Sequence, residues 1–343
     1  MAEVQPGDHD IVYVGYVDLG GVLRGKGVVG REWPHRVRWG VGWPPANVML
    51  TPFGGLAPNA FGSRGDMFVV PDPATLVAVR PIGDSPHLRV ALGHLRTAEG
   101  DPWDCCPRSY LESVLAALEA EAGLTIKGAF EHEFLFSGLE LQPGDPFALG
   151  AFRRIAAFAA DLVPALADAG ITVETFIPEF APQQVEVPVA PAIGMGIADQ
   201  AALFREVVRW VAGGYGARAS FTPIGEVGGV GSGAHLHFSF LDREGKPAAY
   251  DPAAPTGLSA VAASFLAGVR RRLPEIVAVT APTVVSYERL QPHRWSAAWN
   301  TMAVRDREAA LRICPVRPGT GRPEAEQFNM EFRATDCAAN PHL

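Results

Sequence analysis

Seven acidic or imidazole side chains that could hold metal ions stand inside short, otherwise apolar runs of the sequence. They are Glu131, Glu133, Glu179, Glu186, His235, His237 and Glu331. Glu131 and Glu133 flank His132 in GAFEHEFLF, and the alternation of an extended strand places both carboxylates on one face. Carboxylates that close repel each other unless a cation lies between them. A solvent-facing pair on an edge strand is the alternative for these two residues taken alone.

The other acids and the histidines extend this pattern. Glu186 in QQVEVPV and Glu331 in FNMEFRA are each the single acid of an apolar run. One buried carboxylate is costly, whereas several that converge indicate a metal ion. His235 and His237 alternate in AHLHFSF after a glycine-rich stretch. Such histidines alone are also typical of half-exposed strands, but with several carboxylates they favour Mg²⁺ or Mn²⁺ over Zn²⁺, because these harder ions prefer oxygen ligands.

A third group of candidate residues is cationic. It consists of Arg289, Arg305, Arg307, Arg312 and Arg333. Guanidinium groups bind phosphate and carboxylate oxygens two at a time. Any one of these arginines could form an ordinary surface ion pair, but the set beside a two-metal carboxylate site indicates phosphoryl chemistry.

The first hundred residues predict a small β-rich unit. Residues 11–29 are typical of a hairpin around the Gly20-Gly21 turn. Strand-like runs follow at 67–72 and 75–82, and the segment 40–66 between them shows no periodicity. A linker is predicted at 97–107, where turn-forming residues gather.

Beyond the linker, helices and short strands alternate. Amphipathic spacing predicts helices over 108–122, 147–169, 197–213 and 257–273. Extended runs between the helices cover 128–136, 172–179, 183–189, 217–224 and 234–240. These strands must carry the acids and histidines to a common sheet face.

Composition limits the classes of function. The chain has 343 residues, enough for about two domains. Its formal net charge of −8 argues against nucleic acid as a partner, since no basic excess is present. Four cysteines, two of them adjacent, do not form a disulfide framework and fit a cytoplasmic protein. The sequence shows neither a signal peptide nor an apolar run that could span a membrane, so no membrane association is expected.

Six segments in order make this sequence similar to the glutamine synthetase family. They are the Glu-x-Glu strand, PEFAPQQVE, GSGAHLHFS, RLQP, RDREAALRI and MEFRATDCAANPHL. Nearer the start, VDLGGVLRGKGV and GDMFVVPDPATL resemble the family's β-grasp domain. The resemblance implies an α+β fold, with an N-terminal β-grasp domain at 1–98 and a catalytic α/β domain with a curved antiparallel sheet at 107–343. It also implies ring-shaped homo-oligomers whose active sites are shared between neighbouring subunits.

The resemblance assigns ligands to two metal ions, Mg²⁺ or Mn²⁺. The first ion, which helps to bind the amino-acid substrate and the attacking amine, corresponds to Glu133, Glu179 and Glu186. The second ion, which bridges the phosphates of ATP, corresponds to Glu131, His235 and Glu331.

Substrate positions follow from the same motifs. His237 and Ser239 match positions along the nucleotide. Arg289, Arg333 and the backbone of Gly231 match contacts to the amino-acid substrate. Arg307 and Arg312 match arginines on the transferred phosphate. The implied reaction is activation of a γ-carboxylate by ATP to an acyl phosphate, followed by attack of an amine to give an amide.

Several positions depart from the family pattern. The flap glutamate that binds ammonium is Trp295, and 40–66 has no Asp-Gly-Ser-Ser loop. The asparagine before the substrate glycine is Val230, and two basic residues near the phosphates are Glu326 and Asn329. A C-terminal helical portion of the family is also expected to be absent after Leu343.

These departures set the expected acceptor. Ammonium binding requires negative charge, whereas an indole offers only a π face, so an organic amine that packs on Trp295 and Trp299 is expected rather than ammonia. Glutamate or a related acid is the expected acyl donor. Glutamine synthesis from ammonia, and a weakly catalytic regulatory or binding paralogue, are the alternatives. The six retained metal ligands argue against the paralogue, while Val230 and Glu326 argue for it.

Overall fold

The N-terminal part of the molecule is a six-stranded sheet. The computed structural model describes residues 5–138 and 146–343. The strands run in the order β2-β1-β6-β4-β3, with β5 also paired to β6. Their bounds are β1 Ile11–Val17, β2 Leu23–Val29, β3 Val41–Trp43, β4 Met67–Pro71, β5 Val77–Val79 and β6 Leu88–Thr97. Helix α1 (Trp33–Trp39) and the short 3₁₀ turns η1 (Gly30–Glu32), η2 (Pro45–Met49) and η3 (Pro73–Thr75) connect them.

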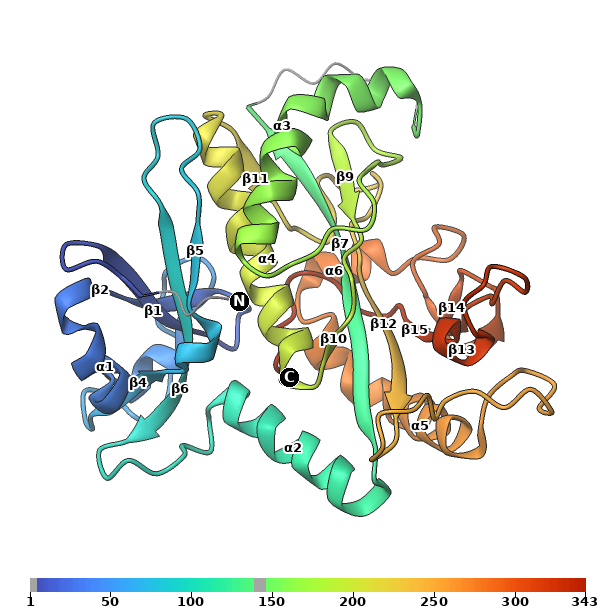
Figure 1. Ribbon diagram of the computed structural model, residues 1–343, viewed down its shortest axis with the longest axis horizontal. Coiled ribbons are helices and arrows are strands. Elements are labelled where there is room, and N and C mark those ends of the chain that lie inside the picture. Colours follow the sequence, from blue (N-terminus) through green and yellow to red (C-terminus); the bar gives the residue numbers. More distant parts are fainter. Residues whose placement is uncertain (1–4, 139–145) are drawn as a thin grey trace.

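The remainder is built on a nine-stranded sheet (Figure 1). Its order is β13-β14-β15-β12-β7-β9-β8, and β10 and β11 also pair with the long strand β7. The bounds are β7 Thr125–Ser137, β8 Ile177–Pro178, β9 Gln184–Val187, β10 Ala192–Ile193, β11 Arg218–Ser220, β12 Ala234–Leu241, β13 Trp299–Val304, β14 Ala309–Ile313 and β15 Met330–Phe332.

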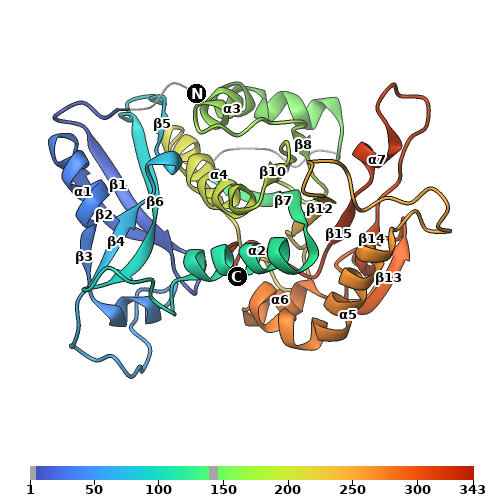
Figure 2. The same ribbon diagram turned by 60° about the horizontal axis from the view of Figure 1, so that its bottom comes forward.

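Helices lie around this sheet, and several of them pack on its apolar side. They are α2 Pro107–Ala122, α3 Leu149–Asp168, α4 Met195–Gly214, α5 Ala260–Thr280, α6 Val284–Arg289 and α7 Glu324–Gln327. Phe134 and Phe136 of β7 pack with Phe158 of α3 and Phe204 of α4 in one core, and Phe238 and Phe240 of β12 pack against Phe265 of α5 in another. In both views α4 lies between the two sheets (Figures 1 and 2).

The expected α+β architecture is confirmed, with differences in detail. The hairpin at 11–29 forms, and Gly21 supplies the positive φ of its turn (73°). The last predicted helix begins at Ala260, behind a Ser259 cap, and continues to Thr280. The segment 40–66 is less irregular than expected because it contains β3 and η2. Contrary to expectation, the nine-stranded sheet is not wholly antiparallel, since β13 and β14 pair in parallel.

A buried ion cluster ties the two sheets together. Arg108, at the start of α2, donates to Asp199 of α4 and to Asp72, which follows β4. His342 lies 2.8 Å from the same Asp199 carboxylate. Burial alone would raise the pKa of Asp199, but His342 and Arg108 hold it below its usual value. The carboxylate is therefore ionised and joins three separate segments of the chain.

We expect Asp199→Ala to lower the free energy of unfolding by about 3 kcal/mol, because it leaves a buried guanidinium without its main partner. Asp168→Ala is the matched control, since Asp168 also bridges the two parts of the molecule, to Arg80, but through a guanidinium that is 47% exposed. That exposed pair is worth less than about 1 kcal/mol. Urea denaturation of both variants measures the difference, and equal losses would contradict the assigned role of Asp199.

Candidate active site

Strand register brings the predicted metal ligands to one face of the second sheet. In the pairing of β7 with β9, Glu133 lies opposite Glu186, and in the pairing of β7 with β12, Glu131 lies opposite His235. On the other side of β12, His237 lies opposite Glu331 of β15. Side chains alternate between the two faces of a strand. His132, between the two glutamates, accordingly faces the other way and stacks on Phe204.

One end of this face holds Glu133, Glu179 and Glu186. Burial, followed by the charges of Glu131, Glu133 and Glu179, raises the pKa of Glu186 to about 10. Burial is also the main reason that the pKa of Glu133 rises to about 7, and Glu179 adds to this rise. Without a cation these carboxylates suppress one another's ionisation. Such an oxygen-rich set suits a hard divalent ion.

The other end holds Glu131, His235 and Glu331. One ligand atom from each lies within 4.8 Å of the others. Burial keeps the pKa of His235 well below its usual value, so the ring is neutral, as a metal ligand requires. Despite its burial, Glu331 stays ionised, because His237, His235 and Arg333 hold its pKa well below its usual range.

Three of the predicted arginines converge on this end. Arg312 of β14 donates to Glu331 Oε2 at 2.7 Å, and Arg333 donates to Glu331 Oε1. Arg289, at the end of α6, is 3% exposed and places Nη2 3.2 Å from His235 Nε2. Arg305 and Arg307 are exposed, and Arg307 contributes its backbone oxygen to Arg333. The structure therefore brings Arg289, Arg312 and Arg333 to the cluster, but not the side chain of Arg307.

Two glycines allow the backbone to approach these side chains. A Cβ atom at Gly231 would lie 2.5 Å from Cγ of Arg289, and one at Gly233 would lie 2.6 Å from His235 Nε2. The amide of Gly233 donates to Glu133 Oε2 at 3.0 Å, and the oxygen of Gly231 accepts from Gln184. A side chain at either glycine would have to displace Arg289 or His235.

His237 and Ser239 continue the same face of β12 beyond the metal ligands. His237 Nε2 lies 3.2 Å from Glu131 and 3.5 Å from Glu331, and its Nδ1 lies 2.8 Å from Asn329 Oδ1. Burial opposes protonation of this ring, but contacts with Cys314, Glu131 and Glu331 raise its pKa. Asn329, one of the departures from the family pattern, thus orients His237. Glu326 instead lies near an exposed arginine, Arg322, at 3.8 Å.

The loop that carries Trp295 is held in an unusual conformation. His293, Trp295 and Ala297 all have positive φ, between 54° and 63°, a region that non-glycine residues rarely adopt. The carboxylate of Glu308 accepts from the backbone amides of both His293 and Trp295, at 3.2 and 2.6 Å. Arg333 donates to the oxygen of Trp295 at 2.8 Å. The Trp295 side chain is 68% exposed.

Sequence reasoning missed three residues of this arrangement. Glu308 follows Arg307 directly in the sequence. No sequence pattern links its carboxylate to Trp295, thirteen residues earlier. Cys314 lies among the site residues, with its Sγ 3.6 Å from His237 Nδ1. No motif in the sequence predicted that this cysteine belongs to the site. Gln184, which donates to Glu133 and to Ser232, also had no local signature.

A cavity among the described residues lies elsewhere. It has a volume of about 320 Å³ and is lined on the opposite face of the sheet by Phe130, His132, Leu236, Phe238 and Phe332, among others. These are the residues that alternate with the site residues on β7, β12 and β15. The cavity is therefore separated from the charged cluster by the sheet itself. Across residues 5–138 and 146–343, no helix is both long and apolar enough to cross a membrane.

Comparison with known proteins places this site in a family. The glutamine synthetase N-terminal domain matches residues 2–103, and the glutamine synthetase catalytic domain matches residues 104–343. The gamma-glutamylpolyamine synthetase GlnA3 of Streptomyces coelicolor is 35% identical over 98% of this chain and 73% of its own length. The glutamine synthetase of Thermotoga maritima is 30% identical over 82% of this chain.

A solved structure described as a novel glutamine synthase homolog is 41% identical and superposes with a TM-score of 0.93, over 100% of this chain and 81% of its own. The matched region spans 64% of the Thermotoga enzyme. Two domain matches that together cover almost every residue, the ordered motifs and the shared fold agree. The chain belongs to the glutamine synthetase family.

Proposed function

We propose that this chain is an ATP-dependent ligase that joins the γ-carboxylate of glutamate, or of a related acid, to an organic amine. The observation that supports this most directly is the single sheet face on which five carboxylates, His235 and three arginines converge. Family membership supports ligase chemistry through an acyl phosphate. The name of the Streptomyces relative supports an amine acceptor.

The residues present fit two divalent cations. Glu133, Glu179 and Glu186 would hold one, and the raised pKa values of Glu133 and Glu186 are the expected property of crowded, buried acids. A second set would hold the other: Glu131, His235 and Glu331. When bound, Mg²⁺ or Mn²⁺ would neutralise phosphate charge and polarise the reacting groups.

The arginines and the strand β12 would position the substrates. Arg312 lies beside Glu331 and would accept phosphate oxygens, while Arg289 and Arg333, with the Gly231 backbone, would hold the acid substrate. His237 and Ser239 would lie along ATP. The phosphate role of Arg307 rests on the family resemblance, since its side chain is exposed.

Trp295 and Trp299 would form the acceptor side of the site. Both side chains are more than half exposed. Burying a carbon chain against them contributes about 25 cal/mol per Å² of apolar surface, and ammonia has no such surface. A loop fixed through Glu308 and Arg333 would present Trp295 without a large ordering cost when the amine binds.

We also propose that residues 1–98 and 107–343 act as separate domains within a ring-shaped homo-oligomer. The two sheets share no strand, which supports this division. Size-exclusion chromatography with light scattering would test the oligomer, and a monomer at assay concentration would contradict it.

Glu133→Gln should lower Mg²⁺-dependent ATP turnover by more than about tenfold, because loss of a direct ligand exceeds the effect of losing an outer partner. The metal-free variant should melt at a higher temperature than the wild type, since one repelling buried charge is gone. Glu174→Gln, an exposed acid from the same region, is the control. Turnover assays across a Mg²⁺ titration and thermal melts measure both effects. Unchanged metal dependence would remove Glu133 from the ligand set.

Trp295→Glu should shift acceptor preference toward ammonia by at least about tenfold, because it replaces an apolar wall with a charge that attracts ammonium. Trp295→Phe should retain the preference for amines, since it keeps an aromatic surface. The ratio of kcat/KM for ammonia to that for the best amine is the measurement. A wild-type enzyme that already prefers ammonia would overturn the acceptor assignment.

Glu308→Ala should raise the KM for the amine several-fold while leaving the KM for ATP nearly unchanged, because it releases the strained backbone at His293 and Trp295. Glu288→Ala, an exposed acid on α6, is the control. Hydrogen exchange of the 293–297 amides gives a readout that is independent of catalysis. Unchanged exchange together with an unchanged amine KM would show that Glu308 does not position this loop.

A further inference from the structure

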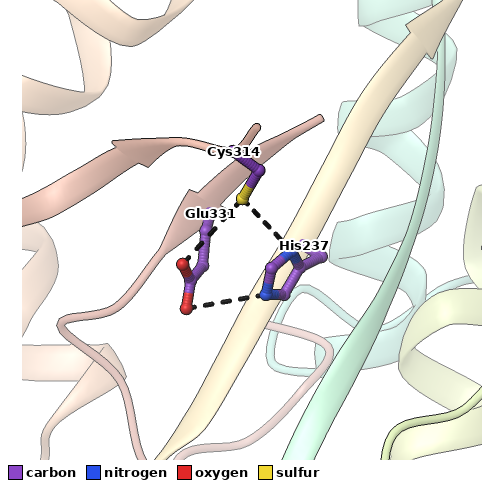
Figure 3. Close-up of side chains that lie close together, drawn as sticks. All are labelled: His237, Cys314 and Glu331. Carbon is purple, nitrogen blue, oxygen red and sulfur yellow. Dashed lines mark hydrogen bonds and ion pairs between the residues drawn. The ribbon is translucent and has the colours of Figure 1, made fainter. Parts of the chain in front are cut away.

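A buried thiol lies at the edge of the proposed active site. Cys314 immediately follows β14 and is 7% exposed. Its Sγ lies 3.6 Å from Nδ1 of His237 and 4.0 Å from Oε2 of Glu331 (Figure 3). The three side chains come from adjacent strands or strand ends, so the sheet holds them in fixed relation. Their order across the sheet is β14, β15 and β12.

The separation of the sulfur and the nearer imidazole nitrogen matches that of two ligands at tetrahedral zinc. One ligand atom from each of the three residues lies within 4.8 Å of the others. Zn–S and Zn–N bonds of about 2.3 and 2.0 Å at a tetrahedral angle separate sulfur from nitrogen by about 3.5 Å. The 3.6 Å between Sγ and Nδ1 is close to that value. Asn329 Oδ1, 2.8 Å from the same Nδ1, places a further oxygen beside the cluster.

The donor set also differs in kind from the carboxylate-rich set. One sulfur, one imidazole nitrogen and one carboxylate oxygen favour a borderline-soft ion such as Zn²⁺, whereas Mg²⁺ prefers oxygen alone. Arg312 and Arg333 bond to the oxygens of Glu331 and place positive charge beside it. Because Glu331 belongs to both sets, the sulfur of Cys314 is the donor that distinguishes this one, and the metal–thiolate bond decides which ion binds.

We propose that Cys314, His237 and Glu331 form a thiophilic metal site that binds Zn²⁺ and thereby inhibits the enzyme. On binding, the thiol proton and one N–H proton of the His237 imidazolium pass to solvent as metal–sulfur and metal–nitrogen bonds form. Glu331 belongs to both this site and the proposed second catalytic metal set, so Zn²⁺ draws on a ligand that catalysis requires. The binding rests on the geometry alone, whereas the inhibition rests on the proposed function.

Cobalt titration tests the binding without any assay of activity. Co²⁺ is added to the chelator-treated, reduced protein in the absence of ATP, and thiolate coordination gives an intense near-ultraviolet charge-transfer band. We expect this band in the wild type, its loss in Cys314→Ser and its displacement by Zn²⁺. Cys105→Ser is the matched control, because Cys105 is the exposed cysteine and should leave the band intact. Thermal melts establish that both variants are folded.

A second arm tests the inhibition. With saturating Mg²⁺, Zn²⁺ should inhibit ATP turnover by the wild type, and Cys314→Ser should require at least about tenfold more Zn²⁺ for the same fractional loss of its own activity. Absence of the cobalt band in the wild type, or its persistence in folded Cys314→Ser, overturns the site. If the chain proves inactive as a ligase, the cobalt titration still decides whether the metal binds, so the two proposals fail separately.

Discussion

The mutual repulsion of buried carboxylates is the constraint around which the catalytic sheet is organised. Glu133 and Glu186 face each other across β7 and β9, and Glu133 adds to the burial that raises the pKa of Glu186. The paired backbones keep these groups together, and the Gly233 amide and Gln184 donate to Glu133. A shift of register by one residue would send them to the apolar face. Hydrogen bonds between the strands therefore hold side chains that electrostatics alone would separate.

The opposite face of the same strands shows how this arrangement is stabilised. His132, which alternates with the two glutamates of β7, is neutral because burial lowers its pKa to about 3, and it stacks on Phe204 at 4.6 Å. Phe134 and Phe136 continue the apolar side. Burial of large aromatic side chains contributes several kcal/mol. One face thus supplies the packing free energy that offsets the charge concentrated on the other.

Local pattern predicted the parts of the site that lie within one strand. The sequence predicted that Glu131 and Glu133 share one face, because side chains of a strand alternate with a period of two. The pairing of Cys314 with His237, and of Glu308 with the Trp295 loop, depends on contacts between separate segments. For Arg307 the motif predicted a contact with the transferred phosphate, but its side chain is exposed. A sequence motif does not fix the direction of an exposed side chain. The parallel pairing of β13 with β14 likewise follows from tertiary packing.

The contact between residue 340 and the first hairpin bears on the order in which the molecule can fold. Asn340 donates from its side chain to the backbone oxygens of Val17 and Asp18, across 323 and 322 residues. A ribosome releases the N-terminal sheet long before this partner is made. The carbonyl of Asp18 already accepts from the amide of Gly21 within the β1–β2 turn, so Asn340 adds a second donor, and docking of the segment around Asn340 is a late step. Until that segment docks, the N-terminal sheet lacks the two side-chain hydrogen bonds that join it to the segment around Asn340.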